Sequence, residues 1–422
     1  MAPPVDPEFA AWLLAQRWYG AKDTLVAAVE LGDRIPELAL VDITPAGHPA
    51  VRYALPEYDG GSGLAEAARE HWFHLLEEGA RIAGAQGRFD FEALMPLGVF
   101  VSSRLSRAEQ SNTSILYTGA ANEPRWILKL FRRVQVGENP DFEIPRALAA
   151  HTGFSNVPAA AGRITYRSWG GEVATLAVLQ NFIPNHGDGW EYAIERLRTG
   201  ENPEALLADL ELLGRRTAEL HAALASIAAE ADFTPEPIST ADLERWRERA
   251  LVGAAAAAPE DAALLRHWCA RMGAGETGLE GLLGCQTIRI HGDYHLGQVL
   301  KTAGDFYLFD FEGEPARPLA ERRRKGTVMQ DVAGMLRSFG YAAHAAARPD
   351  WEGPAREAFL GGYRSALALA PVRLVPEDDA AFTRACSFFE CEKAVYELAY
   401  ERNCRPDWAG IPLAALRKLL VS

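Results

Sequence analysis

The chain has 422 residues, of which 48% are hydrophobic and 24% charged, so it can bury the large core of a globular protein of two or three lobes. Acidic residues outnumber basic ones by 57 to 43, which argues against a general binder of nucleic acid or anionic membranes. The apolar runs are too short to span a bilayer, and the first residues lack the pattern of a signal peptide. Five cysteines without a C-x-x-C pair favour reduced thiols, so we expect a cytoplasmic protein.

Residues 1–95 are expected to form an N-terminal cap subdomain. Phe9, Trp12 and Leu13 have helical spacing, which predicts an amphipathic helix over residues 8–16. The elements expected after it are strands at residues 25–31, 37–43 and 51–55, and a helix over residues 64–82.

Residues 96–183 change to strands with one helix and are expected to form a small lobe that binds a nucleotide. Strands at 100–105 and 113–118 would form a hairpin whose backbone N–H groups approach phosphate oxygens. Its loop has no G-x-G-x-x-G, so it is a weak signal alone. The candidate phosphate contacts there are Ser111, Asn112, Thr113 and Ser114.

Lys129 is the one lysine in an apolar strand over residues 126–131. A buried charge needs a partner, and Glu143 lies at the start of a helix predicted over 142–150. A strand lysine that reaches phosphates and is braced by a helix glutamate is the ion pair of protein kinases. The simpler alternative is that Lys129 extends from a strand end into solvent.

A second apolar strand, residues 174–179, leads into Gln180 and Phe182. A kinase chain crosses there between its lobes and offers backbone groups to adenine, so both residues are candidate nucleotide contacts. Residues 184–422 are then expected to form a mainly helical lobe. The first helices expected in it cover residues 190–198, 203–225 and 239–250.

The segment 291–298, HGDYHLGQ, matches the spacing of the protein-kinase loop H-R-D-x-x-x-x-N. Asp293 would orient and deprotonate an acceptor hydroxyl, while Gln298 would hold a metal ion. After a short strand at 306–309, Asp310 stands where a kinase keeps its main metal-binding aspartate, with Glu312 as a further ligand. An isolated His-Gly-Asp is usually only a turn. The combination therefore carries the prediction of a kinase-type phosphotransferase that uses ATP and Mg²⁺.

Three later segments complete the pattern. Asp331 opens a helix and is expected to support the catalytic loop, near which His221 would pack. The basic run at 321–325 is expected to be a solvated face, with an anion contact at the mouth of the cleft as the alternative. A helix over 388–402 carries tyrosines and charges on one face, which suits a sugar, although surface packing explains it equally well. The candidate substrate contacts are Glu392, Lys393, Tyr396, Glu397 and Tyr400, with His291 and His295 from the loop.

Over nearly its whole length the sequence resembles the bacterial maltokinases, in the aminoglycoside-phosphotransferase-like branch of the kinase fold. The motifs that carry the resemblance lie at 16–22, 109–114, 128–133, 139–143, 179–185, 291–298, 310–315, 331–339, 392–397 and 405–408. Cys391 and the segment 402–404 depart from the residues expected beside the sugar helix.

The resemblance implies an α+β bilobal fold with an N-terminal cap, a small β-rich N-lobe (96–183) and a helical C-lobe (184–422). It also implies an ATP- and Mg²⁺-dependent kinase that converts maltose to maltose 1-phosphate for α-glucan synthesis. It further implies functional coupling to a separate trehalose synthase. We also expect a monomer.

Several alternatives share part of this pattern. A kinase for glucosamine, an aminoglycoside or choline would share every catalytic residue, and related proteins of this shape phosphorylate glucosamine. A non-catalytic pseudokinase would usually lack Lys129, Asp293 or Asp310, all of which are present. A glycosidase that uses Glu312 and Glu314 leaves Lys129 and Gln298 unexplained.

Overall fold

The computed structural model describes residues 5–421 except 17, 57, 59–63, 107–111, 201, 257–261, 274–277 and 316. Contacts divide the chain into two compact units. Unit 1 consists of Met1–Arg146 and Pro158–Ile183, and unit 2 of Ala147–Val157 and Pro184–Ser422.

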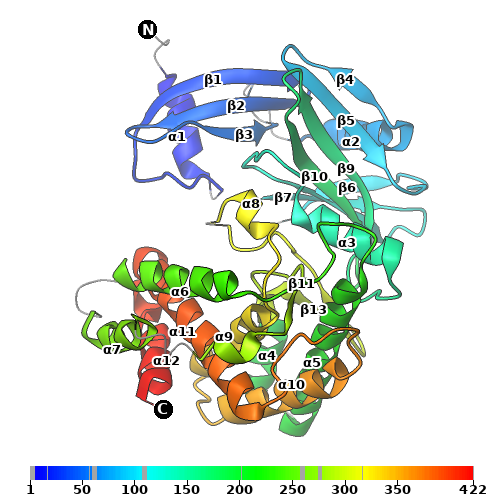
Figure 1. The fold of residues 1–422 in the computed structure, drawn as a ribbon. Helices are drawn as coiled ribbons and strands as arrows, with labels where there is room; N and C mark the ends of the chain where they lie inside the picture. Colours follow the sequence, from blue (N-terminus) through cyan, green and yellow to red (C-terminus); the bar gives the residue numbers. More distant parts are fainter. Residues whose placement is uncertain are drawn as a thin grey trace. The chain divides into compact units, whose positions relative to one another are not determined.

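The first part of unit 1 is a three-stranded antiparallel sheet covered by one helix (Figure 1). Leu13 of α1 (Pro7–Ala15) is fully buried in one cluster with Val41 and Leu55 of the sheet, so the helix packs on it. The three strands are β1 (Val26–Ile35), β2 (Leu38–Pro45) and β3 (Val51–Leu55). The helix and the three strands predicted for this stretch are thus all present.

The second sheet of unit 1 is antiparallel, with the strand order β4-β5-β9-β10-β8-β7-β6. Its strands are β4 (Arg81–Ala83), β5 (Gly87–Ala93), β6 (Ser102–Leu105), β7 (Thr113–Thr118), β8 (Pro124–Leu130), β9 (Ala160–Ser168) and β10 (Val173–Asn181). The sequence analysis did not predict β5 or β9. Since these two strands pair with each other across a long stretch of chain, the sheet depends on contacts far apart in sequence.

One hydrophobic core joins both sheets of unit 1. Trp72 and Phe73 of α2 (Glu66–Glu78) are buried in the same cluster as Leu40 and Ala54 of the small sheet. The structure therefore groups residues 1–95 with the predicted N-lobe in one unit. The predicted helix over 64–82 is too long, because Gly79 ends α2 in the left-handed conformation and the chain continues as β4.

Helices make up most of unit 2, as predicted. They are α4 (Gly189–Thr199), α5 (Pro203–Ser226), α6 (Thr240–Ala255), α7 (Ala262–Gly273), α8 (Leu319–Arg322), α9 (Met329–Ala345), α10 (Glu352–Leu367), α11 (Asp379–Cys404) and α12 (Gly410–Val421). Three 3₁₀ turns accompany them: η1 (Glu280–Leu282), η2 (Leu296–Gln298) and η3 (Pro406–Trp408). One further helix, α3 (Pro140–His151), begins in unit 1 and ends in unit 2.

Two short antiparallel strand pairs complete unit 2. Strands β11 (Glu236–Pro237) and β12 (Gln286–Thr287), which α6 and α7 separate along the chain, form one pair, and β13 (Val299–Lys301) and β14 (Phe306–Leu308) form a hairpin. The sheet-rich unit 1 and the helical unit 2 confirm the predicted α+β class. Among the described helices, none combines the length and the apolar character that crossing a bilayer requires.

Candidate active site

Lys129 lies next to the C-terminal end of β8, which pairs with β7 on one side and β10 on the other. Its Nζ is 3.2 Å from Oδ2 of Asp141 in the first turn of α3, and the Asp141 side chain is only 1% exposed. The predicted brace, Glu143, is buried two residues further along the same helix. Sequence reasoning missed Asp141, which it used only as a helix-start signal.

The other predicted nucleotide contacts also lie in unit 1. Ser111 is outside the described residues, and Asn112 directly precedes β7. Thr113 Oγ1 accepts a hydrogen bond from Arg132 Nε (2.7 Å), while Ser114 is buried. Their predicted contact with phosphates stays a prediction.

Gln180 and Phe182 are engaged within unit 1. Gln180 Nε2 donates to the carbonyl of Asp141 (3.1 Å), and the N–H of Phe182 donates to the carbonyl of Arg125 (2.8 Å). Both groups therefore stabilise the end of β10, and their predicted contact with adenine stays a prediction.

In unit 2, the loop 291–298 is anchored by one buried carboxylate. Asp331 of α9 accepts hydrogen bonds from the N–H groups of His291 (2.8 Å) and Gly292 (2.9 Å). Gly292 has φ +81°, a conformation that side chains rarely adopt. The anchor thus holds the turn directly before Asp293, as the sequence predicted for Asp331.

Asp331 is itself held by a chain of buried side chains. His221 Nε2 lies 3.2 Å from Asp331 Oδ2, and Tyr363 OH lies 2.9 Å from His221 Nδ1. Burial opposes ionisation of Asp331, but the hydrogen bond from His221 and the backbone N–H groups lower its pKa below the usual value. The anchor is therefore an ionised carboxylate.

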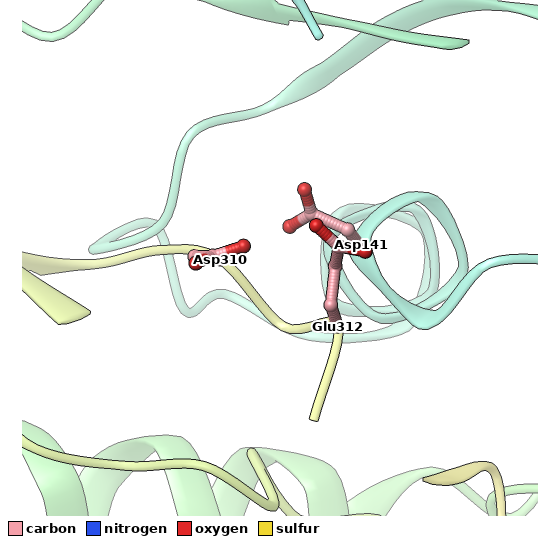
Figure 2. A group of neighbouring side chains, drawn as sticks. All are labelled: Asp141, Asp310 and Glu312. Atoms are coloured by element: carbon pink, nitrogen blue, oxygen red, sulfur yellow. The ribbon is translucent and has the colours of Figure 1, made fainter. Parts of the chain in front are cut away.

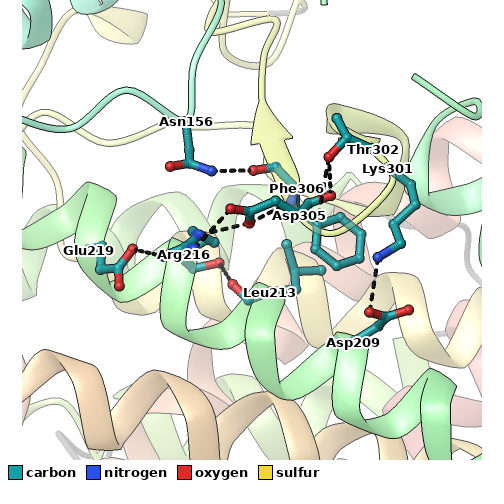
Figure 3. Close-up of polar contacts among 10 residues, drawn as sticks. Asn156, Asp209, Leu213, Arg216, Glu219, Lys301, Thr302, Asp305 and Phe306 are labelled. Carbon is teal, nitrogen blue, oxygen red and sulfur yellow. Dashed lines mark hydrogen bonds and ion pairs between the residues drawn. The ribbon is translucent and has the colours of Figure 1, made fainter. Parts of the chain in front are cut away.

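The β13–β14 hairpin positions the residues predicted to bind metal. Gln298 precedes β13 and Asp310 follows β14, and the N–H of Phe309 donates to the carbonyl of Gln298 (3.1 Å). Ion pairs from α5 hold this hairpin: Arg216 binds Asp305 (2.8 and 2.9 Å), and Asp209 binds Lys301 (2.9 Å) (Figure 3).

Asp310 and Glu312 could hold a divalent cation. Their carboxylate oxygens lie within 4.8 Å of each other on the loop after β14 (Figure 2, which also labels Asp141 of unit 1). Asp310 has φ +66°, which an aspartate tolerates better than most side chains. Carboxylate oxygens are the ligands that Mg²⁺ prefers, so this pair fits the predicted ion.

Lys393 of α11 joins the catalytic loop to the loop after the metal-binding residues. Its Nζ lies 3.0 Å from Oδ1 of Asp293 and 2.7 Å from Oε1 of Glu314. Burial would lower the pKa of Lys393, but these two carboxylates raise it well above the usual value. Burial opposes ionisation of Glu314, yet Lys393 and Arg317 lower its pKa to about 2. Lys393 is thus a fixed cation beside Asp293.

A cavity of about 40 Å³ opens at Asp293, and three of the predicted sugar contacts line it: Glu392, Lys393 and Tyr396. Glu392 is bound there by the guanidinium of Arg249 (2.7 Å). Sequence reasoning missed Arg249 as the partner of Glu392, and Glu314 and Arg317 as parts of the cavity lining. Only the charged residue types in the 310–317 segment could have indicated the last two.

Two predicted sugar contacts on α11 do not line this cavity. Glu397 is bound by Arg337 of α9 (2.7 and 3.0 Å), and burial raises the pKa of its carboxyl. Tyr400 is 48% exposed, and the guanidinium of Arg405 lies 5.6 Å from its ring. Glu397 lies about 100° around the helix from Tyr396, and Tyr400 lies one turn further along it, so both face other partners.

The two histidines of the catalytic loop, His291 and His295, form hydrogen bonds to backbone groups. His291 Nε2 donates to the carbonyl of Phe309 (2.9 Å), which connects the catalytic loop to the metal loop. His295 Nδ1 accepts from the N–H of Gly297 (3.1 Å), and burial lowers the pKa of His295. An imidazole with this bond is neutral and organises η2, so the predicted sugar contact of either histidine stays a prediction.

Residues 104–369 match the model of the Phosphotransferase enzyme family (APH), which covers more than half of the chain. The chain belongs to this family. This membership confirms the broader part of the predicted resemblance, namely the one to aminoglycoside-phosphotransferase-like kinases. The predicted cofactors, ATP and Mg²⁺, are the usual ones of kinases with this fold.

The phosphotransferase is similar to two curated relatives, both named glucosamine kinase. The one from Streptacidiphilus jiangxiensis is 28% identical over 396 residues, covering 88% of this chain and 86% of the relative. The one from Mycolicibacterium smegmatis is 29% identical over 329 residues, covering 74% and 78%.

Solved structures support the fold. A glucosamine kinase (crystal form B) superposes with a TM-score of 0.69 at 23% identity, covering 99% of this chain and 100% of that one. Another, a glucosamine kinase in complex with glucosamine, ADP and inorganic phosphate, has a TM-score of 0.66 at 24% identity over the full length of both chains. These similarities confirm the predicted kinase-like architecture.

Proposed function

We propose that this phosphotransferase is a sugar kinase that transfers the γ-phosphoryl group of ATP to a hydroxyl group of a sugar, with glucosamine as the first candidate acceptor. The observation that carries the proposal is the arrangement in unit 2. There Asp293, in a loop anchored by Asp331, faces a small polar cavity, and the Asp310–Glu312 pair follows on the adjoining hairpin. The relatives' names supply the acceptor.

In this proposal each residue has a separate role. Asp293 orients the sugar hydroxyl and accepts its proton. General-base catalysis of this kind raises the rate by about 10²–10⁴-fold. Asp310 and Glu312 would hold Mg²⁺, with Gln298 as a further ligand, and the ion would neutralise charge on the phosphates. Lys129 would contact the α- and β-phosphates.

The sequence resemblance favoured maltose as the acceptor, whereas the names of the relatives favour glucosamine. One observation in the pocket supports a neutral sugar as the second candidate. Asp293, Glu314 and Glu392 are each already paired with a lysine or an arginine. An ammonium group would have to displace one of these cations, while a neutral hydroxyl would not.

A product assay separates the candidates. Purified protein is incubated with Mg²⁺·ATP and glucosamine, glucose, maltose or trehalose, and phosphorylated sugar is detected by ³¹P NMR. We expect one sugar phosphate to form, at a rate that falls by about 10²–10⁴-fold in Asp293→Asn. The proposal is contradicted if no sugar raises ATP consumption above that of the reaction without sugar, or if Asp293→Asn is as active as the wild type.

Two further expectations depend on the acceptor. Functional coupling to a separate trehalose synthase and a role in α-glucan synthesis follow only if maltose is phosphorylated. A monomeric state stays a prediction, which light scattering of the purified protein tests.

A further inference from the structure

A second cavity, of about 210 Å³, adjoins the Asp293 pocket within unit 2. The two cavities share four lining residues: Gly292, Glu314, Arg317 and Gln330. The larger cavity has a strongly basic lining and is here called the arginine cavity. The cationic side chains that line it are Arg245, Arg249, Arg317, Arg322, Arg324 and Lys325.

The charge of this lining opposes that of the whole chain. Six cationic side chains face two carboxylates, Glu314 and Glu321, whereas the chain carries 57 acidic and 43 basic residues. Composition therefore does not explain the cluster. An anion in the cavity would offset the positive charge of this lining.

Most of the cationic groups are held in place by acidic partners. Glu392 binds Arg249 (2.7 Å), Glu314 binds Arg317 (2.5 Å) and Glu236 binds Lys325 (2.5 Å). Such pairs restrict the side chains, so less conformational entropy is lost when a ligand binds. The arginine cavity is thus arranged before any ligand arrives.

Arg324 differs from the others. Its guanidinium is exposed and forms no hydrogen bond or ion pair with the part of the chain that the structure describes. Two residues earlier in the chain, Arg322 donates a hydrogen bond to the carbonyl of Glu312 (2.7 Å), which connects the cavity to the metal-binding loop. A planar guanidinium with its donors available binds phosphate and carboxylate groups through two parallel hydrogen bonds.

We propose that the arginine cavity is an oxyanion subsite, which binds a phosphate or carboxylate group beside the acceptor pocket. Its volume is smaller than the roughly 300–1,000 Å³ of sites that enclose a whole ligand, so it suits one group. The inference rests on the proposed sugar-kinase function for the sugar at Asp293. The oxyanion belongs either to the acceptor itself, a sugar acid or sugar phosphate, or to inorganic phosphate bound next to a neutral sugar.

Binding of inorganic phosphate tests the subsite. Equilibrium dialysis with ³²P-phosphate is done on the full chain saturated with Mg²⁺ and a non-hydrolysable ATP analogue, so that the nucleotide's own phosphates fill their site. We expect saturable binding that weakens by roughly tenfold in Arg324→Gln, and further in Arg324→Glu. The matched control is Arg348→Gln, an exposed arginine of unit 2 outside both cavities, which should bind as the wild type does.

A second arm identifies the source of the oxyanion. Gluconate and glucose 6-phosphate are assayed as acceptors, and phosphate as an inhibitor of the neutral-sugar reaction. Turnover of an anionic sugar whose KM rises in Arg324→Gln assigns the subsite to the acceptor. Inhibition by phosphate that saturating neutral sugar does not relieve, and that is lost in Arg324→Gln, assigns it to the free ion.

The outcomes separate this inference from the proposed function. Phosphate that does not bind, or that binds equally well to Arg324→Glu, overturns the subsite even if a neutral sugar is phosphorylated normally. If the wild type phosphorylates no sugar, the proposed function fails, while the dialysis still reports on the subsite.

Discussion

Different kinds of bond hold the catalytic loop and the part of α11 that lines the acceptor cavity. That part, here called the acceptor wall, carries Glu392, Lys393 and Tyr396. The loop is held through its backbone, because Asp331 accepts the N–H groups of His291 and Gly292. The wall is held through side chains, because Lys393 binds Asp293 and Glu314.

This difference separates reaction from substrate choice. A backbone anchor sets the shape of the loop and works with any acceptor. Ion pairs between side chains can be replaced one at a time, which changes what the pocket binds without moving the loop. We therefore expect changes near Asp331 and Asp310 to affect kcat or stability, and changes on α11 to affect the KM for the sugar.

The largest effect is expected from Asp310→Asn, which removes a carboxylate from the metal-binding pair. We expect kcat to fall by at least about 10³-fold at every ATP concentration, because the lost charge stabilisation amounts to several kcal/mol. Steady-state kinetics with ATP as the varied substrate measure this. Asp350→Asn, at an exposed ion pair, is the control and should leave kcat unchanged. A kcat within tenfold of wild type would remove Asp310 from the metal site.

Asp331→Ala breaks the backbone anchor. It leaves two N–H groups and His221 without their buried carboxylate, so we expect a loss of about 3–5 kcal/mol in the free energy of unfolding. Urea unfolding measures the loss, and Asp350→Ala, at an exposed ion pair, should leave stability nearly unchanged. If both variants unfold alike, Asp331 does not hold the loop.

Gly334→Ala tests how closely α9 approaches the catalytic loop. A Cβ there would lie 2.5 Å from the carbonyl oxygen of Tyr294, so the loop must shift, at a cost of about 1–3 kcal/mol. Gly361→Ala in α10 is the matched control, because a Cβ there meets open space, and it should be neutral or stabilising. Equal stability of the two variants would contradict the close packing.

The smallest effects are expected on α11. Tyr396→Ala should raise the KM for the sugar about tenfold and the KM for ATP less than about twofold, because its side chain lines the acceptor cavity. Lys393→Ala should raise the KM for the sugar as well, and it should also lower kcat, because Nζ binds Asp293 and Glu314. Tyr400→Ala, outside that cavity, serves as the control. Equal changes in the two KM values would remove Tyr396 and Lys393 from the acceptor site.

The parts of the site that the sequence places together are local in the chain, and their roles stay predictions. Asp293, Gln298 and Asp310 lie on one short segment, and a loop and hairpin of that length bring them together in few ways. The strand of Lys129 was predicted for the same reason, since one charge in an apolar run is visible in the sequence.

Partners of charged residues were harder to predict. Asp141 forms an ion pair with Lys129 that spacing alone did not predict, because the packing of α3 brings this first-turn carboxylate to β8. Glu143 as a partner of Lys129 stays a prediction. Glu397 was expected in the sugar pocket, whereas Arg337 of α9 binds it. Spacing on one helix shows which side chains share a face but not what that face meets.

By itself the sequence determined the kinase-type loop, the strand at 306–309 that follows it and the division into strand-rich and helical parts. These depend on residue types at short spacings, which set turns and periodicity. Only the tertiary structure decided that His221, Asp331 and Tyr363 form one buried chain, and that six basic side chains from α6, α8 and their neighbours surround one cavity. Such groupings come from segments far apart in sequence, and the packing of helices alone sets which of their charges meet.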